Sequence, residues 1–270
     1  MTDTKTIDYA ALPPTLDSLV AILERLRAPG GCPWDREQTR ETLSRCLAEE
    51  CAEFLEAVDH KDIDSICDEL GDLLMNVILQ AVVAREQGDF TLADVFGNVN
   101  SKLVRRHAHV FGDATAETAT DVLAVWEKIK SKEKNYHRTS VLDGVPCEMS
   151  SLNRAEKLQR KAAKVGFDWD SEAGIIAKIE EELAEFKEAW QKGDQDHADE
   201  ELGDLLFAVS NLTRFRKRRT AEELLRSAND KFIRRFQFIE QELAAQNIAI
   251  ADAGIDRMET LWQQAKSITG

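Results

Sequence analysis

Long apolar runs, paired cysteines and glycine-rich phosphate loops are all missing from this sequence of 270 residues. Without about 18 consecutive apolar residues, no segment is expected to span a membrane, and the N-terminus "MTDTKTIDYA" lacks the basic and apolar regions of a signal peptide. The five cysteines form no CxxC pair, so we interpret them as reduced. We therefore expect a cytoplasmic protein that makes no membrane contact.

Positive charge is also in short supply. The 35 Lys and Arg residues face 50 Asp and Glu residues, which gives a formal net charge of −15. Binding to the phosphate backbone of nucleic acid draws on Lys and Arg that displace counterions, so this balance argues against nucleic acid as a partner. A small anionic substrate would need a metal cation between itself and the many carboxylates.

Helical periodicity dominates what is present, and few segments have the alternation of strands. A first helix ends near residue 28 and others are predicted over 39–58, 62–87, 91–107, 151–165, 172–192, 196–218 and 220–245. The stretch "KEKNYHRTSVLDGVPCEMS" (132–150) has little helical period and contains a turn, so it separates two domains. Short connections favour antiparallel packing. We predict an all-α fold of two tandem four-helix-bundle-like domains, residues 1–137 and 138–270.

An internal repeat supports this division. The segment "EECAEFLEAVDHKDIDSICDELGD" (49–72) returns without a gap as "EELAEFKEAWQKGDQDHADEELGD" (181–204), with 13 of 24 positions identical and an offset of 132 residues. Each half of the chain therefore carries one copy of the same helical unit.

Both copies contain carboxylates spaced as ExxE and, sixteen residues on, ExxD. These are Glu50, Glu53, Glu69 and Asp72 in the first copy, and Glu182, Glu185, Glu201 and Asp204 in the second. A spacing of three places each pair on one helix face, and antiparallel helices let the pairs converge. Such oxygen-only ligands suit Mg²⁺ or Mn²⁺. A solvated acidic face is the plainer alternative, but the identical spacing and the mid-helix Gly71 and Gly203 favour binding.

Other signals leave alternatives open. The pairs Lys102 with Arg106 and Lys231 with Arg235 have i, i+4 spacing, which suits either ordinary ion pairing or a clamp on phosphate. Tryptophans 34 and 169 follow glycine turns and are interpreted as core residues, with base stacking as the alternative. A redox metal site is disfavoured because the ExxH pattern of di-iron bundles is absent. A non-catalytic acidic module that docks a basic protein would not need the matched spacing.

The ordered motifs "GCPWDREQT", "EECAEF", "DELGDLL", "KLVRRHAHVFGD", "WEKIK", "SVLDGVP", "KVGFDW", "EELAEF", "EELGDLLFAV" and "NDKFIRRF" resemble a two-repeat MazG-type nucleoside triphosphate pyrophosphohydrolase over nearly the whole chain. Arg40 and Ala108 depart from the usual His and Pro of that family. The resemblance implies an all-α homodimer that uses Mg²⁺ to hydrolyse NTPs or dNTPs to monophosphate and pyrophosphate, mainly in its second repeat.

By the same resemblance, the four acids of the second copy hold the metal, Lys178, Lys231 and Arg235 contact the phosphates, and Trp262 lies against the nucleotide. Glu181 or Glu182 is the expected general base, since sequence does not separate a ligand from a base among adjacent glutamates. The acids of the first copy, with Lys102 and Arg106, form a possible second metal site. Lys178 precedes Glu182 by one helical turn where the first copy has Cys46, so we expect the first repeat to be weak or structural.

Overall fold

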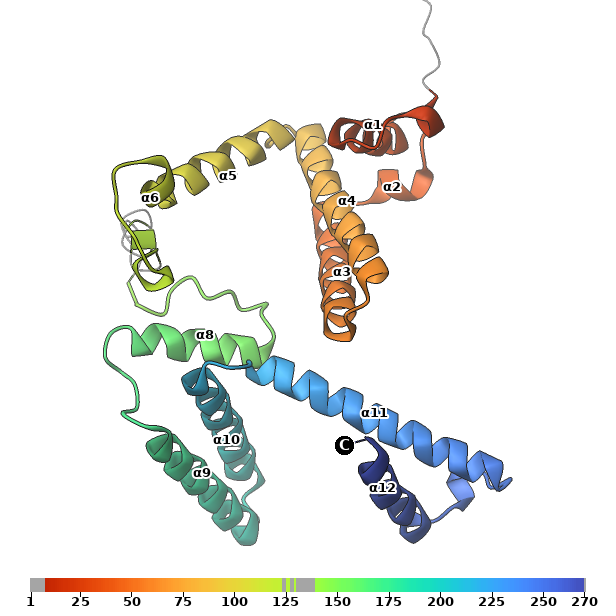
Figure 1. The fold of residues 1–270 in the computed structure, drawn as a ribbon, viewed down its shortest axis with the longest axis vertical. Coiled ribbons are helices and arrows are strands. Elements are labelled where there is room, and N and C mark those ends of the chain that lie inside the picture. The colour runs from red at the N-terminus through yellow and green to blue at the C-terminus, as the bar shows by residue number, and fades with distance from the viewer. Residues whose placement is uncertain (1–7, 123–124, 127–128, 130–138, 270) are drawn as a thin grey trace, which may run out of the picture. The chain divides into compact units, whose positions relative to one another are not determined.

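The computed structural model describes residues 8–122, 125–126, 129 and 139–269, and within that part the chain is helical without strands (Figure 1). The expected all-α fold is confirmed. The chain divides into two compact units, Met1–Asn135 and Tyr136–Gly270. Among the described residues, no helix combines the length and the apolar character needed to cross a bilayer.

The first unit is built around a long antiparallel hairpin. Its helices are η1 (Tyr9–Ala11), α1 (Leu16–Arg27), α2 (Pro33–Glu37), α3 (Arg40–His60), α4 (Ile63–Gln87), α5 (Leu92–Arg106) and α6 (Ala108–Phe111). The side chains of Thr39, Asp62 and Thr91 accept hydrogen bonds from the first turns of α3, α4 and α5. These caps start the three helices within one or two residues of the predicted positions. Helix α1 crosses α4 and closes an apolar core made of Leu23, Leu43, Ile78, Leu79, Val82 and Val83.

The second unit repeats this plan and adds a further helix. It contains α8 (Ser151–Ala163), α9 (Glu172–Lys192), α10 (Gln195–Arg216), α11 (Ala221–Ala245), η2 (Ile250–Asp252) and α12 (Ile255–Thr269). The hairpin α9–α10 corresponds to α3–α4, and α12 folds back on α11 through Ile239, Leu243 and Leu261. Helix α12 was not predicted.

A buried carboxylate joins three helices of the second unit. Glu156 on α8 is 3% exposed and accepts hydrogen bonds from Thr213 Oγ1 on α10 (2.8 Å) and from the backbone N–H of Ala221 at the start of α11 (2.6 Å). A negative charge at a helix N-terminus is stabilised by the helix dipole. Glu156 therefore fixes where α11 begins relative to α8 and α10.

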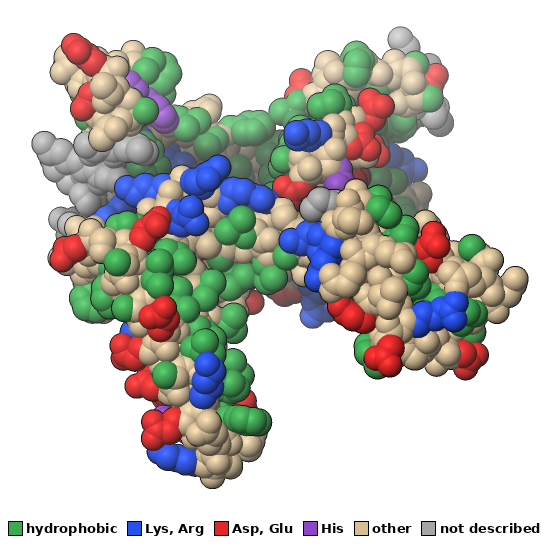
Figure 2. All heavy atoms as spheres, turned by 60° about the horizontal axis from the view of Figure 1, so that its bottom comes forward, with side chains coloured by type: hydrophobic (Ala, Val, Ile, Leu, Met, Phe, Trp, Pro, Cys, Tyr) green, Lys and Arg blue, Asp and Glu red, His purple; other side chains and the backbone are tan. Residues whose placement is uncertain are grey.

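The last long helix of each unit leaves its hairpin. Helix α11 has its main contacts with α8, α12 and the end of α10, and it extends together with α12 away from the α9–α10 pair (Figure 1). The hairpin consequently keeps large apolar side chains at the surface, among them Trp190 on α9 and Leu202, Leu206 and Val209 on α10. Green side chains of this kind lie exposed between charged ones in Figure 2.

Candidate functional site

The repeated acids of the second unit meet across the α9–α10 hairpin. One carboxylate oxygen each from Glu182 on α9 and from Glu201 and Asp204 on α10 lie within 4.8 Å of one another. The turn that folds the hairpin is set by Gly193 in the left-handed region and by the Asp194 cap on α10. We call Glu182, Glu201 and Asp204 the second triad.

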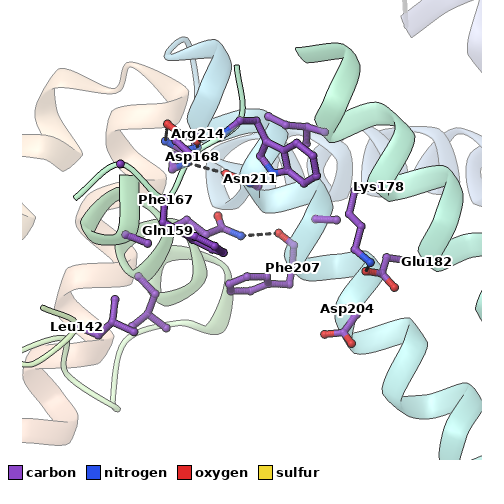
Figure 3. A pocket seen from close by; sticks show the side chains of 16 residues that line it. Leu142, Gln159, Phe167, Asp168, Lys178, Glu182, Asp204, Phe207, Asn211 and Arg214 are labelled. Carbon is purple, nitrogen blue, oxygen red and sulfur yellow. Dashed lines mark hydrogen bonds and ion pairs between the residues drawn. The ribbon is translucent and has the colours of Figure 1, made fainter. Parts of the chain in front are cut away.

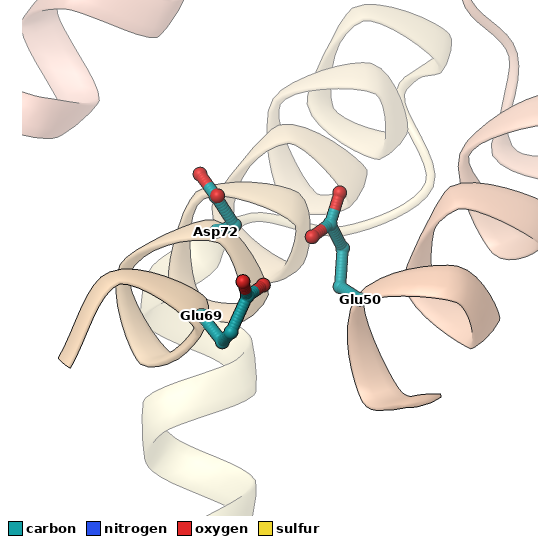
Figure 4. A group of neighbouring side chains, drawn as sticks. All are labelled: Glu50, Glu69 and Asp72. Atoms are coloured by element: carbon teal, nitrogen blue, oxygen red, sulfur yellow. The ribbon is translucent and has the colours of Figure 1, made fainter. Parts of the chain in front are cut away.

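The first unit forms the same arrangement. Glu50 on α3 and Glu69 and Asp72 on α4 also place one oxygen each within 4.8 Å of one another (Figure 4). We call these three residues the first triad. Glu53 and Glu185 lie outside the triads, although the charge of Glu53 acts on Glu69 and that of Glu185 on Glu201. The expected convergence of carboxylates is thus present in both units for three acids of each four.

The second triad is partly balanced by a cation. Lys178 Nζ lies 2.7 Å from Glu182 Oε1 and 2.7 Å from Glu181 Oε1. These contacts raise the pKa of Lys178, with Glu181 the larger cause, and the hydrogen bond from Lys178 lowers the pKa of Glu182 even though that residue is 5% exposed. Burial raises the pKa of Glu201, and its Oε1 lies 3.0 Å from His197 Nε2. The predicted position of Lys178 beside Glu182 is confirmed.

The first triad has no such balance. Burial raises the pKa of Glu50, with the charge of Asp72 as the next cause, and burial followed by the charge of Glu53 raises the pKa of Glu69. Within the described residues no ion pair reaches these acids, and Glu69 Oε2 is buried without a hydrogen-bond partner. Cys46 stands where the second unit has Lys178.

Both triads fit a hard divalent cation. Their donors are oxygens only, which is the ligand type of Mg²⁺ and Mn²⁺. Carboxylates at this separation repel one another, and Glu182 and Glu201 are also buried. The Glu69 Oε2 atom is a buried polar atom that the described residues leave without a hydrogen bond. An added Cβ at Gly71 or Gly203 would meet nothing within 4 Å, so no described residue packs against the backbone at these two glycines.

Of the three basic residues expected at the phosphates, only Lys178 lies on the α9–α10 hairpin. Lys231 and Arg235 are on α11, where the Arg235 guanidinium stands 5.6 Å from the centroid of the Trp262 ring. The charges that act on the second triad come instead from Lys178, Glu185 and His197. In the first unit, Arg106 stands 5.0 Å from the Trp126 ring, and Lys102 is on the same helix, α5. The structure therefore gathers Arg235 with Trp262 and leaves both outside the second triad of the same chain.

A pocket of about 620 Å³ opens beside the second triad. Lys178, Glu182 and Asp204 border it at one end, and Asp168, Asn211 and Arg214 at the other, with Gln159 and Phe207 between them (Figure 3). Its size is that of a site for a small organic ligand. Trp169, interpreted from sequence as a core residue, is 42% exposed and lines this pocket. Sequence reasoning missed the rest of the lining, although polar Asn211 within the apolar run of α10 was a visible signal.

Comparison with known proteins assigns the family. The MazG nucleotide pyrophosphohydrolase domain matches residues 38–111 and 170–238, which contain both triads. The chain belongs to the MazG family. It is 42% identical over 250 residues to the nucleoside triphosphate pyrophosphohydrolase/pyrophosphatase MazG of Thermotoga maritima, covering 93% of this chain and 95% of that protein. It is 43% identical over 255 residues to a nucleoside triphosphate pyrophosphohydrolase of Escherichia coli, covering 93% and 97%.

A solved mazG-related protein from Thermotoga maritima is also similar. It shares 30% identity and covers 43% of this chain and 99% of its own, with a TM-score of 0.39. That score is too low for a comparison of helix arrangement. The resemblance stated from the motifs is confirmed by the family match and by the long alignments.

Proposed function

We propose that this protein hydrolyses nucleoside triphosphates to nucleoside monophosphate and pyrophosphate at the second triad, with Mg²⁺ or Mn²⁺. The observation that carries the proposal is the second triad itself: three carboxylates within 4.8 Å, a lysine at 2.7 Å, and a pocket of nucleoside size that shares Lys178, Glu182 and Asp204 with them. Membership of the MazG family indicates the reaction, and the proposed substrates include both ribonucleoside and deoxyribonucleoside triphosphates.

The chain's own residues would divide the work as follows. Glu182, Glu201 and Asp204 would hold the cation, with Glu185 close enough for its charge to act on Glu201. A bound divalent cation would neutralise charge on the phosphate oxygens and lower the pKa of a coordinated water. Glu181 or Glu182 would take the proton as water attacks the α-phosphorus, and the bond from that phosphorus to the oxygen bridging to the β-phosphate would break, releasing pyrophosphate.

Lys178 would change partners during this cycle. Its ammonium now bridges Glu181 and Glu182, and both bonds keep it charged. When Glu182 holds a cation, the Lys178 ammonium would no longer be needed to balance its charge and could donate to a phosphate oxygen. This exchange supports Lys178 as a phosphate ligand and Glu181 as a base that is released at the same time.

The second unit would carry most of the activity, and the first would be weak or structural. The two triads are alike in geometry, but the first has Cys46 in place of the lysine and two acids whose pKa is raised. Unbalanced acids favour a cation, whereas a triphosphate brought next to them would not find a lysine at the place that Lys178 has in the second unit. Lys102 and Arg106 on α5 would serve the first site only if another chain or helix movement brought them near.

A homodimer would complete the second site. Lys231, Arg235 and Trp262 lie on the α11–α12 arm, outside the triad of their own chain, while the α9–α10 hairpin exposes the apolar side chains of Leu202 and Leu206. A second copy laid on the hairpin would bury that surface. It would also offer two cations and a tryptophan to the nucleotide.

Paired variants test the assignment to the second unit. Pyrophosphate and orthophosphate release from a panel of NTPs and dNTPs would be measured separately for wild type, Glu50→Gln with Glu53→Gln, and Glu182→Gln with Glu185→Gln, at equal folded concentration. We expect pyrophosphate from wild type, near-normal rates from the first pair and at least a 100-fold loss from the second. Orthophosphate as the sole product would contradict the reaction, and loss confined to the first pair would reverse the assignment.

A further inference from the structure

The pocket beside the second triad has a polar and aromatic end that the proposed chemistry does not use. Along α10, Asn211 follows Asp204 by seven residues, so it lies two turns away on the same face, roughly 10 Å along the helix. Helix α9 runs antiparallel, which brings its start, near Gly174, to that same end of the hairpin. The distance leaves room for the sugar and base of a nucleotide whose phosphates lie at the triad.

Aromatic rings form walls of this end. Trp169 and Phe207 both line the pocket and keep 42% and 45% of their surface exposed. The Trp169 ring rests directly against the helix backbone at Gly174, because a Cβ there would lie 2.7 Å from the ring atom Cε3. The Trp169 ring therefore occupies the space that a side chain at position 174 would fill, and any residue larger than glycine there would displace the ring. Flat rings with a free face suit a planar ligand that stacks.

Two amides in the pocket have unused hydrogen-bonding atoms. Gln159 is 7% exposed and donates through Nε2 to the carbonyl of Phe207 (2.8 Å), while its Oε1 finds no partner among the described residues. Asn211 is the reverse case: its Oδ1 accepts from Arg214 Nε (2.7 Å), which leaves its NH₂ group without a partner in the described part of the chain. The pocket thus has one free acceptor and one free donor.

The ion pair behind Asn211 fixes the orientation of its amide. The Arg214 side chain is 8% exposed and pairs with Asp168, with Nη1 at 3.2 Å from Oδ2. The carboxylate of Asp168 in turn accepts from the backbone N–H of Trp169 (2.9 Å). Arg214 therefore couples the stacking wall and the amide donor into one rigid group.

The first unit keeps the tryptophan, as Trp34, but has other residues at the places of Asn211, Arg214, Gln159 and Gly174. With the offset of 132 residues, Leu79 and Val82 stand at the places of Asn211 and Arg214, and both are 4% exposed within the apolar core. Before the hairpin the offset is 135 residues, as Trp34 and Trp169 show, so Glu24 stands at the place of Gln159, where it pairs with Arg85. Thr42 stands at the place of Gly174, so a side chain fills the space that the tryptophan ring occupies in the second unit. The corresponding Trp34 is 61% exposed.

We propose that this end of the pocket binds the nucleobase of the substrate, stacked on Trp169 with its hydrogen-bonding edge toward Asn211 and Gln159, and that these residues set which bases are accepted. The inference rests on the proposed function, because it takes the triphosphate to lie at the second triad. Gln159 and Trp169 lie outside the matched domain segment 170–238, so the base pocket is assembled partly from residues beyond the shared domain.

The test separates the base from the rest of the nucleotide. The values of kcat/KM for pyrophosphate release from the four NTPs would be compared with that for ribose 5-triphosphate, which has the same sugar and phosphates but no base. The variants are Asn211→Leu, which introduces the residue of the first unit, and Trp169→Ala. Trp34→Ala in the first unit is the matched control, and unchanged helical circular dichroism establishes that each variant is folded.

We expect wild type to prefer at least one NTP over ribose 5-triphosphate by about tenfold or more, since stacking and an amide contact each contribute on that scale. Trp169→Ala should remove most of this preference and Asn211→Leu should change the order among the bases, while the rate on ribose 5-triphosphate stays within about twofold. Equal loss on both kinds of substrate, or no change in preference, would overturn the base pocket. If wild type released no pyrophosphate from any NTP, the proposed function itself would fail.

Discussion

Replacing Lys178 with Cys, the residue at the matching place in the first unit, isolates the electrostatic balance of the second triad. The ammonium lies 2.7 Å from the carboxylate of Glu182, which is 5% exposed, and 2.7 Å from that of Glu181. Its removal leaves Glu182 buried next to Glu201 with no cation at that distance. The metal-free protein should therefore lose stability.

The burial of Glu182 sets the size of this loss. An exposed i, i+4 ion pair contributes only about 0.3–0.5 kcal/mol to helix stability, whereas a buried group left without its partner costs about 1–3 kcal/mol. The Lys178 side chain is itself 35% exposed, so water screens part of the attraction and the lower half of that range applies. With roughly 3–4 °C per kcal/mol for a domain of this size, the melting temperature should fall by about 3–8 °C.

The helix provides its own control. Lys192 pairs with Glu188 at 2.5 Å with the same i, i+4 spacing on α9, but the two side chains are 66% and 65% exposed. Lys192→Ala should cost no more than about 0.5 kcal/mol. Thermal unfolding of both variants would be followed by circular dichroism with a chelator and then with saturating Mg²⁺, which should raise the melting temperature of the Lys178 variant more than that of wild type.

Two outcomes would refute this reasoning. If Lys178→Cys and Lys192→Ala lowered the melting temperature equally, burial of Glu182 would not govern the ion pair. A response to Mg²⁺ no larger in the Lys178 variant than in wild type would show that the lysine and the cation do not balance the same charge. The reciprocal change, Cys46→Lys, should raise the melting temperature of the metal-free protein, because it gives Glu50 the cation that it lacks.

Four further outcomes are expected. Asp204→Asn should abolish pyrophosphate release with unchanged helical circular dichroism, because a metal ligand loses its charge but no volume; wild-type turnover under saturating Mg²⁺ would remove it from the site. Mg²⁺ should raise the melting temperature more than NaCl at equal ionic strength, and an equal rise would argue against a specific site. The raised pKa of Glu50 and of Glu69 means that folding takes up protons there, so metal-free protein should lose stability as pH rises through those raised values, and Mg²⁺ should weaken that dependence in calorimetric melts. Gly174→Thr should change the base preference in the same way as Trp169→Ala. Retention of the wild-type preference would show that the position of the Trp169 ring does not depend on the missing side chain at Gly174.

The secondary structure was largely predictable because its determinants are local. Thr39, Asp62 and Thr91 are capping residues directly before apolar periodicity, and Gly88 and Gly193 end helices in the left-handed conformation. Such signals need no tertiary information. Asn247 and Gly254, both with positive φ, mark the loop before α12. The helix itself was missed because it gains its stability from packing on α11.

The triads were also predictable, since spacing along two antiparallel helices determines which acids can meet. Spacing does not determine which fourth acid stays outside, because the rotamers of Glu53 and Glu185 depend on charge and on what is bound. The packing of α11 was less accessible to sequence. Its i, i+4 cations indicate a face but not the partner of that face, and the structure turns Arg235 toward Trp262.

The nucleoside end of the pocket required comparison of the repeats in three dimensions. Asn211 reads as a polar interruption of an apolar run, and Gln159 as an ordinary residue of a polar helix. Only the fold brings both beside Trp169 and shows that a missing Cβ at Gly174 makes the contact possible. An isolated glycine near a helix start carries no such information, because many helices tolerate one there.

The differences between the two units distinguish the carboxylates that could hold a cation from the neighbouring residues that would bind a substrate. Both kept three converging carboxylates, but the first unit filled the neighbouring positions with Leu79 and Val82, which close its core. A closed unit gains stability from those side chains and gives up the space that a base would need. Its triad nevertheless retains acids of raised pKa and the unpaired Glu69 oxygen, an arrangement that is destabilising until a cation occupies it. Under the proposed function, a divalent cation at the first triad would stabilise the fold, and one at the second triad would also lie beside Lys178 and the pocket proposed for the substrate.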